Sequence, residues 1–185
     1  MADGSLNVLL LGCEAVGKTL LARRIRSITS GTPLERGHLE TASTTGQEIE
    51  SLATGEVSTT LREVGSPMIP LWPSYLAASD ALVFVVDLSQ PEQVAASSVE
   101  LNRLIRHEGM KGTPCLVLLN KIDALRRLTV AETADLMGLC EVALAAEERG
   151  TKLECIACSG VTGAGCGDVV ERLKAWAAAK PSQSG

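Results

Sequence analysis

The chain has 185 residues, 45% of them hydrophobic, and a formal net charge of −5. This length and composition predict one domain with its own core over residues 1–180, followed by a disordered polar tail at residues 181–185. The negative charge argues against a protein that grips nucleic acid, and the basic cluster Arg23, Arg24 and Arg26 is interpreted as a solvated helix face.

The first half of the chain begins with the apolar run LNVLLLG at residues 6–12, which predicts a buried strand. A helix is expected over GKTLLARRIRSI, residues 17–28, and the polar stretch from residue 29 to 47 shows little periodicity. The segment EIESLATGEVSTTLREV, residues 48–64, alternates weakly. It predicts two strands joined by a turn at Thr54–Gly55.

The second half continues with buried strands and helices in alternation. Two of its helices begin with a capping-box pattern, SQPE starting at Ser89 and the pair Thr129 and Glu132. The expected elements are a strand at 81–88, a helix at 89–108, a strand at 114–121, a helix at 129–139, a fourth buried strand at 152–158 and a helix at 167–179.

Continuous apolar strands separated by helices predict an α/β fold. The sheet is expected to be mostly parallel and six-stranded, with one antiparallel edge strand and helices on both faces. Ligands of such a sheet bind outside the carboxyl ends of its strands, so the motifs that follow the strands carry the functional information.

The first of these motifs is GCEAVGKT, residues 12–19, which has the spacing G-x-x-x-x-G-K-T between a strand and a helix. Successive backbone N–H groups of such a loop wrap a phosphate, and the helix N-terminus adds its positive dipole end. Lys18 is expected to reach the β- and γ-phosphates, and the Thr19 hydroxyl to ligate Mg²⁺. The alternative, a flexible glycine turn, is disfavoured by the strand–loop–helix context.

The second motif is NKID, residues 120–123, at the end of the third buried strand. The Asp123 carboxylate can accept hydrogen bonds from guanine N1–H and N2–H₂, a donor pair that adenine lacks. Lys121 can lay its stem along the base, and Asn120 can tie neighbouring loops together. Downstream of a phosphate-binding loop in the same sheet, this motif indicates a guanine-binding site.

The order of these motifs resembles the small Ras-type GTPases, and within them the Arf-like branch. The stretch IPLWPSYLAASDALVFVVDLSQPE, residues 69–92, is similar to that branch's second switch and following strand, and Pro70, Leu71, Trp72 and Tyr75 match its P-L-W-x-x-Y pattern. The resemblance covers nearly the whole chain. It implies the P-loop small G-protein fold, GTP or GDP and Mg²⁺ as ligands, and a monomeric switch that binds effector and regulatory proteins.

The resemblance also implies roles for residues outside the two motifs. TTGQE, residues 44–48, is similar to the first-switch T-x-G, which assigns Thr44 to Mg²⁺ and the γ-phosphate, with Thr41 and Thr45 as alternatives. Glu63 stands in place of the family aspartate and is expected to hold Mg²⁺ through a water, while the Gly65 N–H is expected to sense the γ-phosphate. No catalytic residue is assigned. The metal ligands expected are Thr19, Thr44 and Glu63.

The loop IACSG that ends the last strand is expected to donate a backbone N–H to guanine O6, with Cys158 as the candidate. The alternative is an ordinary strand-to-helix turn. The nucleotide-binding residues expected in all are Glu14, Ala15, Val16, Gly17, Lys18, Thr19, Leu20, Gly65, Asn120, Lys121, Asp123, Ala157, Cys158 and Ser159.

The second switch departs from the family pattern D-x-G-G-Q. Ser66 replaces the second glycine, Pro67 stands where the glutamine is expected, and two further residues are missing before Pro70. Proline has neither a side-chain amide nor a backbone N–H with which to orient a water, so very slow intrinsic GTP hydrolysis is predicted. A non-cycling pseudo-GTPase that serves as an interaction module is the alternative. A P-loop kinase is disfavoured by the NKID motif.

Two aromatic residues of this switch, Trp72 and Tyr75, are three residues apart at helical spacing. They are expected either to pack on the sheet or to form an aromatic effector surface, and both alternatives remain open. Arg62 replaces the tryptophan that the family carries just before the second-switch acid, which would alter such a surface.

Six cysteines lie in mostly apolar segments and are interpreted as buried free thiols of a reducing compartment. A zinc site is disfavoured because the chain has one C-x-x-C, formed by Cys155 and Cys158. Residue 2 is alanine, so the N-myristoylation pattern is absent and no direct lipid anchor is expected. The family resemblance implies a role in membrane traffic, to or from cilia, and the expectation is a cytoplasmic protein that reaches membranes through partners.

Overall fold

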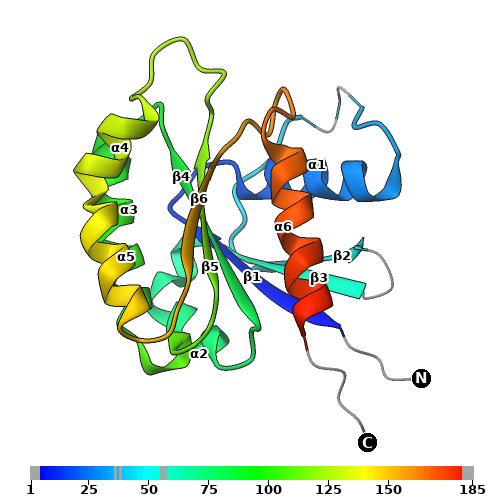
Figure 1. Cartoon of the computed structure of the whole chain (residues 1–185). Helices are drawn as coiled ribbons and strands as arrows, with labels where there is room; N and C mark the ends of the chain where they lie inside the picture. The colour runs from blue at the N-terminus through cyan, green and yellow to red at the C-terminus, as the bar shows by residue number, and fades with distance from the viewer. Residues whose placement is uncertain (1–4, 36, 38, 55–57, 181–185) are drawn as a thin grey trace, which may run out of the picture.

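A six-stranded sheet forms the centre of the structure, a computed structural model that describes residues 5–35, 37, 39–54 and 58–180 (Figure 1). Its strands are β1 (Leu6–Gly12), β2 (Gln47–Ala53), β3 (Ser58–Val64), β4 (Ala81–Asp87), β5 (Cys115–Asn120) and β6 (Leu153–Ala157).

The strands lie in the order β2-β3-β1-β4-β5-β6. Every neighbouring pair is parallel except β2 with β3, which is antiparallel and places β2 at one edge. The predicted fold, a mostly parallel six-stranded sheet with one antiparallel edge strand, is therefore confirmed. All residues of β4 and β5 are buried, as their continuous apolar sequences require of strands covered on both faces.

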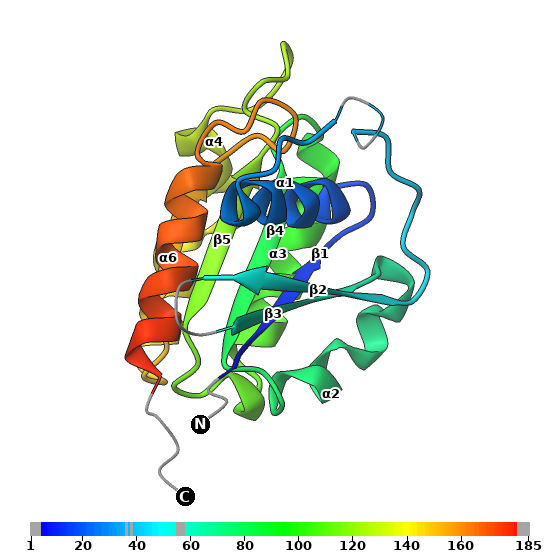
Figure 2. The same cartoon turned by 90° about the vertical axis from the view of Figure 1, so that its right-hand side faces the viewer.

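Helices cover both faces of the sheet, as Figures 1 and 2 show. The pair α1 and α6 packs on one face, where it meets side chains such as Val8 and Leu10 of β1, and the other helices pack on the opposite face against Leu9 and Leu11. Within the described residues, no helix is long and apolar enough to cross a membrane. The helices are α1 (Lys18–Ser30), α2 (Trp72–Leu76), α3 (Pro91–Ile105), α4 (Val130–Met137), α5 (Leu139–Glu147) and α6 (Cys166–Ala179).

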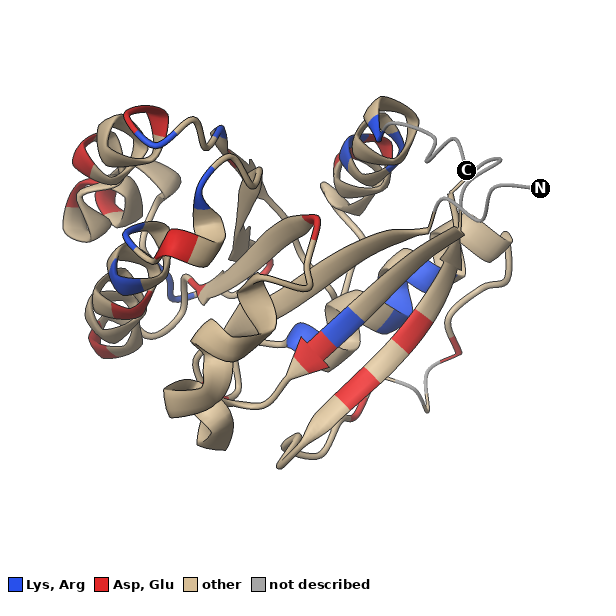
Figure 3. Cartoon of the chain, turned by 90° about the horizontal axis from the view of Figure 1, so that it is seen from below, with Lys and Arg blue, Asp and Glu red and all other residues tan. Residues whose placement is uncertain are grey.

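Charged side chains of both signs are interspersed over the helices in the view of Figure 3. The edge strand β2 carries Glu48, which is exposed, and Glu50, whose carboxylate lies 2.9 Å from the guanidinium of Arg26 on α1. The arginine cluster of α1 is therefore not uniformly solvated, because one of its members pairs with the neighbouring strand.

The two predicted capping boxes have different outcomes. At α4 the box is present, because the Glu132 N–H donates to Thr129 Oγ1 at 3.1 Å and the Thr129 N–H donates to Glu132 Oε2 at 2.8 Å. At α3 the prediction is wrong. That helix begins at Pro91 with Gln90 as its N-cap, and Ser89 instead donates its hydroxyl to Asp87 Oδ1 at 2.6 Å.

The elements β6 and α5 differ from what the sequence predicts. The strand β6 is not a fourth fully buried strand, because it forms the second edge of the sheet and its residues are half-buried or exposed. Cys155 on β6 and Cys140 on α5 are consequently exposed, whereas the other four thiols are buried as predicted. Helix α5 was not predicted. The tail 181–185 and Gly55 of the predicted turn lie outside the described residues.

Trp72, at the start of α2, belongs to the core. Its side chain is fully buried and meets Phe84 of β4 edge to face, with 6.3 Å between the ring centroids and 84° between the ring planes. Its indole Nε1 donates to the Gly65 carbonyl at 3.3 Å. Of the two alternatives for this residue, packing on the sheet is the one seen here, while Tyr75 is half-buried.

Replacing Trp72 with alanine should therefore destabilise the fold by about 3–5 kcal/mol, because it removes a large buried aromatic side chain. The measurement is the free energy of unfolding in urea. Leu71→Ala is the matched control, since Leu71 is the preceding residue and is 54% exposed; its change should stay within about 0.5 kcal/mol. Equal effects of the two substitutions would contradict the buried position of Trp72.

Candidate functional site

The loop that joins β1 to α1 has a backbone fixed by close approaches. Gly17 has φ +92°, and a Cβ atom there would lie 2.7 Å from Asn120 Nδ2. A Cβ on Gly12 would lie 2.5 Å from the Val85 carbonyl oxygen. Both glycines of the predicted motif are thus required by packing as well as by backbone conformation. Ala15, between them, has a positive φ of 56°.

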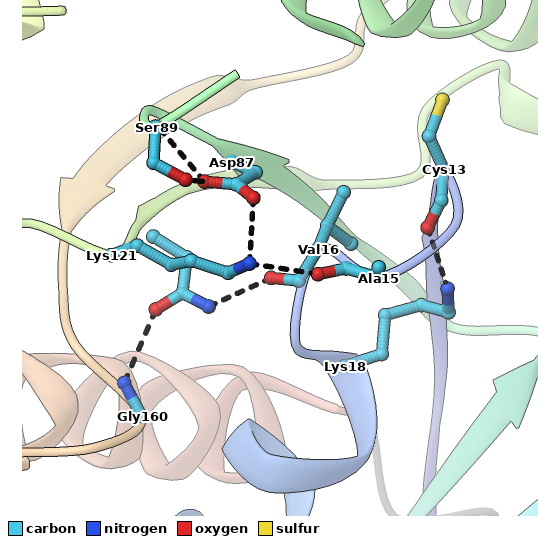
Figure 4. A network of polar contacts seen from close by, with 9 residues as sticks. Cys13, Ala15, Val16, Lys18, Asp87, Ser89, Lys121 and Gly160 are labelled. Carbon is cyan, nitrogen blue, oxygen red and sulfur yellow. Dashed lines mark hydrogen bonds and ion pairs between the residues drawn. The ribbon is translucent and has the colours of Figure 1, made fainter. Parts of the chain in front are cut away.

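The Lys18 side chain is buried, and its ammonium group turns back toward the backbone of this loop. Its Nζ donates to the Gly12 carbonyl at 2.9 Å. It also donates to the Cys13 carbonyl at 2.9 Å (Figure 4). Burial lowers the pKa of Lys18, while the nearby charges of Glu63, Cys13 and Glu14 oppose the shift. The ammonium is thus held at the phosphate-binding loop, where an anionic phosphate would add the opposite charge that burial makes favourable.

A cavity of about 180 Å³ lies in front of this loop and is shared by three segments of the chain. The phosphate-binding loop and α1, the first-switch stretch and the segment after β3 all contribute to its wall. The sequence therefore correctly indicated segments that meet in space. The lining residues are Glu14, Ala15, Gly17, Lys18, Thr19, Thr41, Ala42, Ser43, Thr44, Glu63 and Ser66.

The three predicted metal ligands are in contact. The Thr19 hydroxyl donates to Glu63 Oε1 at 2.9 Å and lies 3.2 Å from the Thr44 hydroxyl. Thr44, rather than Thr41 or Thr45, is the first-switch threonine in hydrogen-bond contact with Thr19. Hydroxyl and carboxylate oxygens are the ligands that Mg²⁺ prefers, so this donor set fits the ion.

Glu63 itself is buried, with 3% of its surface exposed. Burial raises the pKa of Glu63, and hydrogen bonds from Thr19 and Thr44 together with the charge of Lys18 oppose the rise. A buried carboxylate with one ammonium nearby is suited to a cation, because a cation would offset the cost of taking its charge out of water.

Gly65 makes a contact that the sequence did not predict. Its N–H, the expected γ-phosphate sensor, donates to the Gly46 carbonyl at 2.8 Å. A Cβ at Gly65 would overlap the Thr44 carbonyl oxygen, so glycine is needed for the two switch segments to lie this close. Gly65 can reach a phosphate only by exchanging its bond to Gly46, and the sensor role stays a prediction.

At the base end, Asn120 joins two loops. Its Nδ2 donates to the Val16 carbonyl at 2.8 Å, and its Oδ1 accepts the Gly160 N–H at 3.1 Å. The interpretation that Asn120 ties neighbouring loops together agrees with these contacts. Leu20, by contrast, does not line the cavity, because its side chain packs under Gly160, where a Cβ would lie 3.1 Å from Leu20 Cγ.

Lys121 is held at two points. Its Nζ donates to the Ala15 carbonyl at 2.9 Å and forms an ion pair with Asp87 Oδ2 at 2.6 Å. Asp87 is fully buried at the end of β4 and its other oxygen accepts hydrogen bonds from Ser89. Asp87 was not predicted from the sequence, although an acid at the end of a continuous apolar strand indicated it.

The predicted guanine O6 donors are engaged elsewhere. The Cys158 N–H donates to the Leu119 carbonyl at 2.9 Å and the Ser159 N–H to the Ala164 carbonyl at 2.9 Å, while Ala157 is the last residue of β6. The ladder with β5 thus continues to Cys158, and the free turn begins later than predicted. Within the described part of the chain, the N–H groups of Val161 and Gly165 have no acceptor, so they are the backbone donors of this loop that remain available.

Comparison with known proteins decides the family. The model of the Arf family, described as the ADP-ribosylation factor family, matches residues 1–176. The chain belongs to the ADP-ribosylation factor family. The predicted Arf-like small GTPase is therefore confirmed, and membership of this family implies guanine-nucleotide binding.

Several Arf-family relatives support this assignment. Human ADP-ribosylation factor-like protein 16 is 34% identical over 161 residues, which cover 85% of this chain and 80% of that protein. Human ADP-ribosylation factor-like protein 4D is 32% identical over 176 residues, covering 91% and 81%. The sequence features by which this chain resembles protein 16 are the glutamate of REVG, the shortened second switch and the alanine at position 2.

A solved structure supports the fold. The Arl6 BBS3 small GTPase of Trypanosoma brucei, with bound nucleotide analogue GppNp, superimposes with a TM-score of 0.79 at 24% identity and covers 96% of this chain and 99% of that one. Small GTPases of this kind bind effectors and regulators through their switch regions, which here are the segments that meet at the 180 Å³ cavity.

Asp123 provides a test of base recognition in this Arf-family protein. Its side chain is exposed and makes no hydrogen bond within the described residues, so it is available to the base. Asp123→Ala should weaken GDP binding by about 1.5–3 kcal/mol, the worth of charge-assisted hydrogen bonds. The measurement is equilibrium titration of GDP and of IDP, whose base lacks the 2-amino group.

The wild-type protein should prefer GDP to IDP, and Asp123→Ala should reduce that preference. Asp135→Ala, which removes an exposed carboxylate from α4, is the control and should change neither affinity. A GDP preference that survives in Asp123→Ala would contradict the role given to this carboxylate.

Proposed function

We propose that this protein is a guanine-nucleotide switch of the Arf-like type that holds GTP for a long time, because its intrinsic hydrolysis is very slow or depends on a partner. Thr19, Thr44 and Glu63 would hold Mg²⁺, which neutralises phosphate charge when bound. The observation that carries the proposal is Pro67. It occupies the place of the family glutamine and begins, with Ser66, the 3-10 helix Ser66–Leu71.

The chemistry of GTP hydrolysis explains why this residue matters. The reaction depends mainly on positioning a water and stabilising charge, and the loss of a positioned polar group costs orders of magnitude in rate. Pro67 is exposed and does not line the cavity, whereas the neighbouring Ser66 does. Glu63, one of the two acids that line the cavity, already accepts a hydrogen bond from the Thr19 hydroxyl. Among the described residues that line the cavity, none carries a side-chain amide that would orient the water.

The proposal extends to the cellular role. We infer a monomeric cytoplasmic protein of membrane or ciliary traffic that reaches membranes and cilia through effector partners. Family resemblance supports this part. The half-buried Tyr75 and the exposed Leu71 are the second-switch side chains available to an effector, while Trp72 would act beneath them.

A second candidate is a non-cycling interaction module that binds GTP constitutively. The Gly65 N–H bond to the Gly46 carbonyl favours it, because the donor that a γ-phosphate sensor would use is already bonded to the first switch. In this case the surface offered to partners would be the same in the GTP and GDP forms.

We expect single-turnover hydrolysis of bound GTP to be about 10²–10³-fold slower than in an Arf-family protein that retains the glutamine, which is the cost of losing one positioned polar group at a reaction centre. The measurement is release of phosphate from the preloaded protein in excess Mg²⁺. Binding of GTP is measured on the same sample, so that a slow rate is not confused with an empty site. A rate equal to that of the glutamine-bearing protein would overturn the proposal.

The switch and the module differ in their response to nucleotide. For a switch, amide hydrogen exchange of residues 41–47 and 65–72 should slow on replacing GDP with a non-hydrolysable GTP analogue, because phosphate contacts order these segments. Exchange in β5, which is buried on both faces, serves as the internal control. Identical exchange in the two forms would support the non-cycling module.

A further inference from the structure

Two cysteines lie together beneath the loop that connects β6 to α6. Cys158 follows β6 and Cys166 is the first residue of α6, and both side chains are fully buried. The chain between them folds back on itself, because the Ser159 N–H donates to the Ala164 carbonyl and a Cβ on Gly165 would lie only 3.1 Å from the Cys158 Cα atom. The residues on either side of the loop are thus brought close by backbone contacts.

The two thiols are close enough that each shifts the pKa of the other. The Cys166 thiol donates to the Ser159 carbonyl oxygen at 3.4 Å, and the Cys158 thiol donates to Asn120 Oδ1 at 3.9 Å. The pair therefore touches Asn120, the residue that joins the guanine end of the site to the phosphate-binding loop.

The surroundings favour a thiolate at Cys166. Its hydrogen bond from Cys158 lowers the pKa of the Cys166 thiol, burial opposes the shift, and the positive charge of Arg24 lowers the pKa further. Cys166 also begins a helix of 14 residues, whose N-terminus favours negative charge. The hydrogen bond to Cys166 and burial raise the pKa of Cys158, which therefore keeps its proton.

Arg24 connects this pair to the loop above it. Its guanidinium donates to the carbonyls of Gly160 and Val161, at 3.0 and 2.6 Å, so the same side chain fixes the loop and faces Cys166. The other buried cysteines lack such a setting. Cys13 accepts from the Ser97 hydroxyl, and burial raises the pKa of the Cys115 thiol.

We propose that Cys158 and Cys166 form a reversible disulfide on oxidation by hydrogen peroxide, and that this bond clamps the loop of residues 159–165 at the guanine end of the site. The Cys166 thiolate attacks a peroxide oxygen and the O–O bond breaks, which leaves a sulfenic acid at Cys166 and hydroxide. Cys158 then attacks the Cys166 sulfur, its proton leaves with the displaced hydroxide as water, and the S–S bond forms.

In total two thiols and one peroxide give one disulfide and two waters, and peroxide takes up two electrons. A dithiol reductant reverses the bond. Because the covalent link limits the conformations open to the loop that carries Gly160 and Val161, guanine nucleotide should leave the oxidised protein severalfold more slowly. This effect on release rests on the proposed guanine-binding function, whereas formation of the disulfide does not.

The test uses the full chain with Cys140→Ser and Cys155→Ser, which removes the two exposed thiols from residues outside the nucleotide site. The protein is treated with hydrogen peroxide, denatured in an alkylating reagent and digested with trypsin. The segment from residue 153 to 172 then contains Cys158 and Cys166 as its only cysteines. The expected product is that peptide without alkylation and lighter by two hydrogen atoms, restored to the dithiol by dithiothreitol.

Release of a fluorescent GDP analogue is measured on the same samples. Release should slow severalfold after oxidation and recover after reduction, and Cys166→Ser should abolish both the disulfide and the change in rate. Full alkylation of both thiols after peroxide treatment would overturn the proposal, and a disulfide without any change in release would overturn the clamp. A reduced protein that binds no guanine nucleotide would instead refute the proposed function, and the mass measurement would still decide the disulfide.

Discussion

The site depends on the two hydrogen bonds that the Asn120 side chain makes. It spans from the phosphate-binding loop at Val16 to the loop after β6 at Gly160, using both ends of one amide. Gly17 must lack a side chain because Asn120 Nδ2 occupies the space where a Cβ would lie. This amide therefore holds together three segments that are far apart in the chain. It links the phosphate end of the site to the base end.

A second set of contacts couples the two switch segments. The hydroxyls of Thr19 and Thr44 and the carboxylate of Glu63 converge in front of the phosphate-binding loop, and Gly46 and Gly65 are joined through their backbones. Glu63 is the last residue but one of β3. The parallel pairing of β3 with β1 fixes the position of Glu63 relative to the phosphate-binding loop. The sheet therefore sets where the acid sits, and the first-switch loop is the part free to change its contacts.

Motifs whose function comes from local backbone geometry were predictable, and those decided by distant packing were not. The phosphate-binding loop, NKID and the capping box at Thr129 each depend on residues within one short segment. By contrast, Ser89 has a capping pattern but is held by Asp87, and Cys158 lies in a small-residue loop but remains in the ladder with β5. The sequence leaves both orientations of Trp72 open. Its contacts with Phe84 of β4 and with the Gly65 carbonyl show that it lies in the core.

The constraints on Gly65 fit the proposed switch, in which one short segment contacts the nucleotide but lacks the group that aids hydrolysis. The N–H of Gly65 is bonded to the first switch at Gly46, and its carbonyl accepts from the Trp72 indole and from the Met68 N–H. The carbonyl side is thus anchored to the core through Trp72. The N–H side contacts a loop that is half-buried or exposed, so it is the side whose bond can be exchanged. Pro67 lies within the anchored turn, where its ring holds φ near the value that the 3-10 helix uses. A glutamine at position 67 would restore a side-chain amide. Proline instead stiffens the turn that carries Gly65. The stiffness of this turn and the missing amide therefore have the same cause.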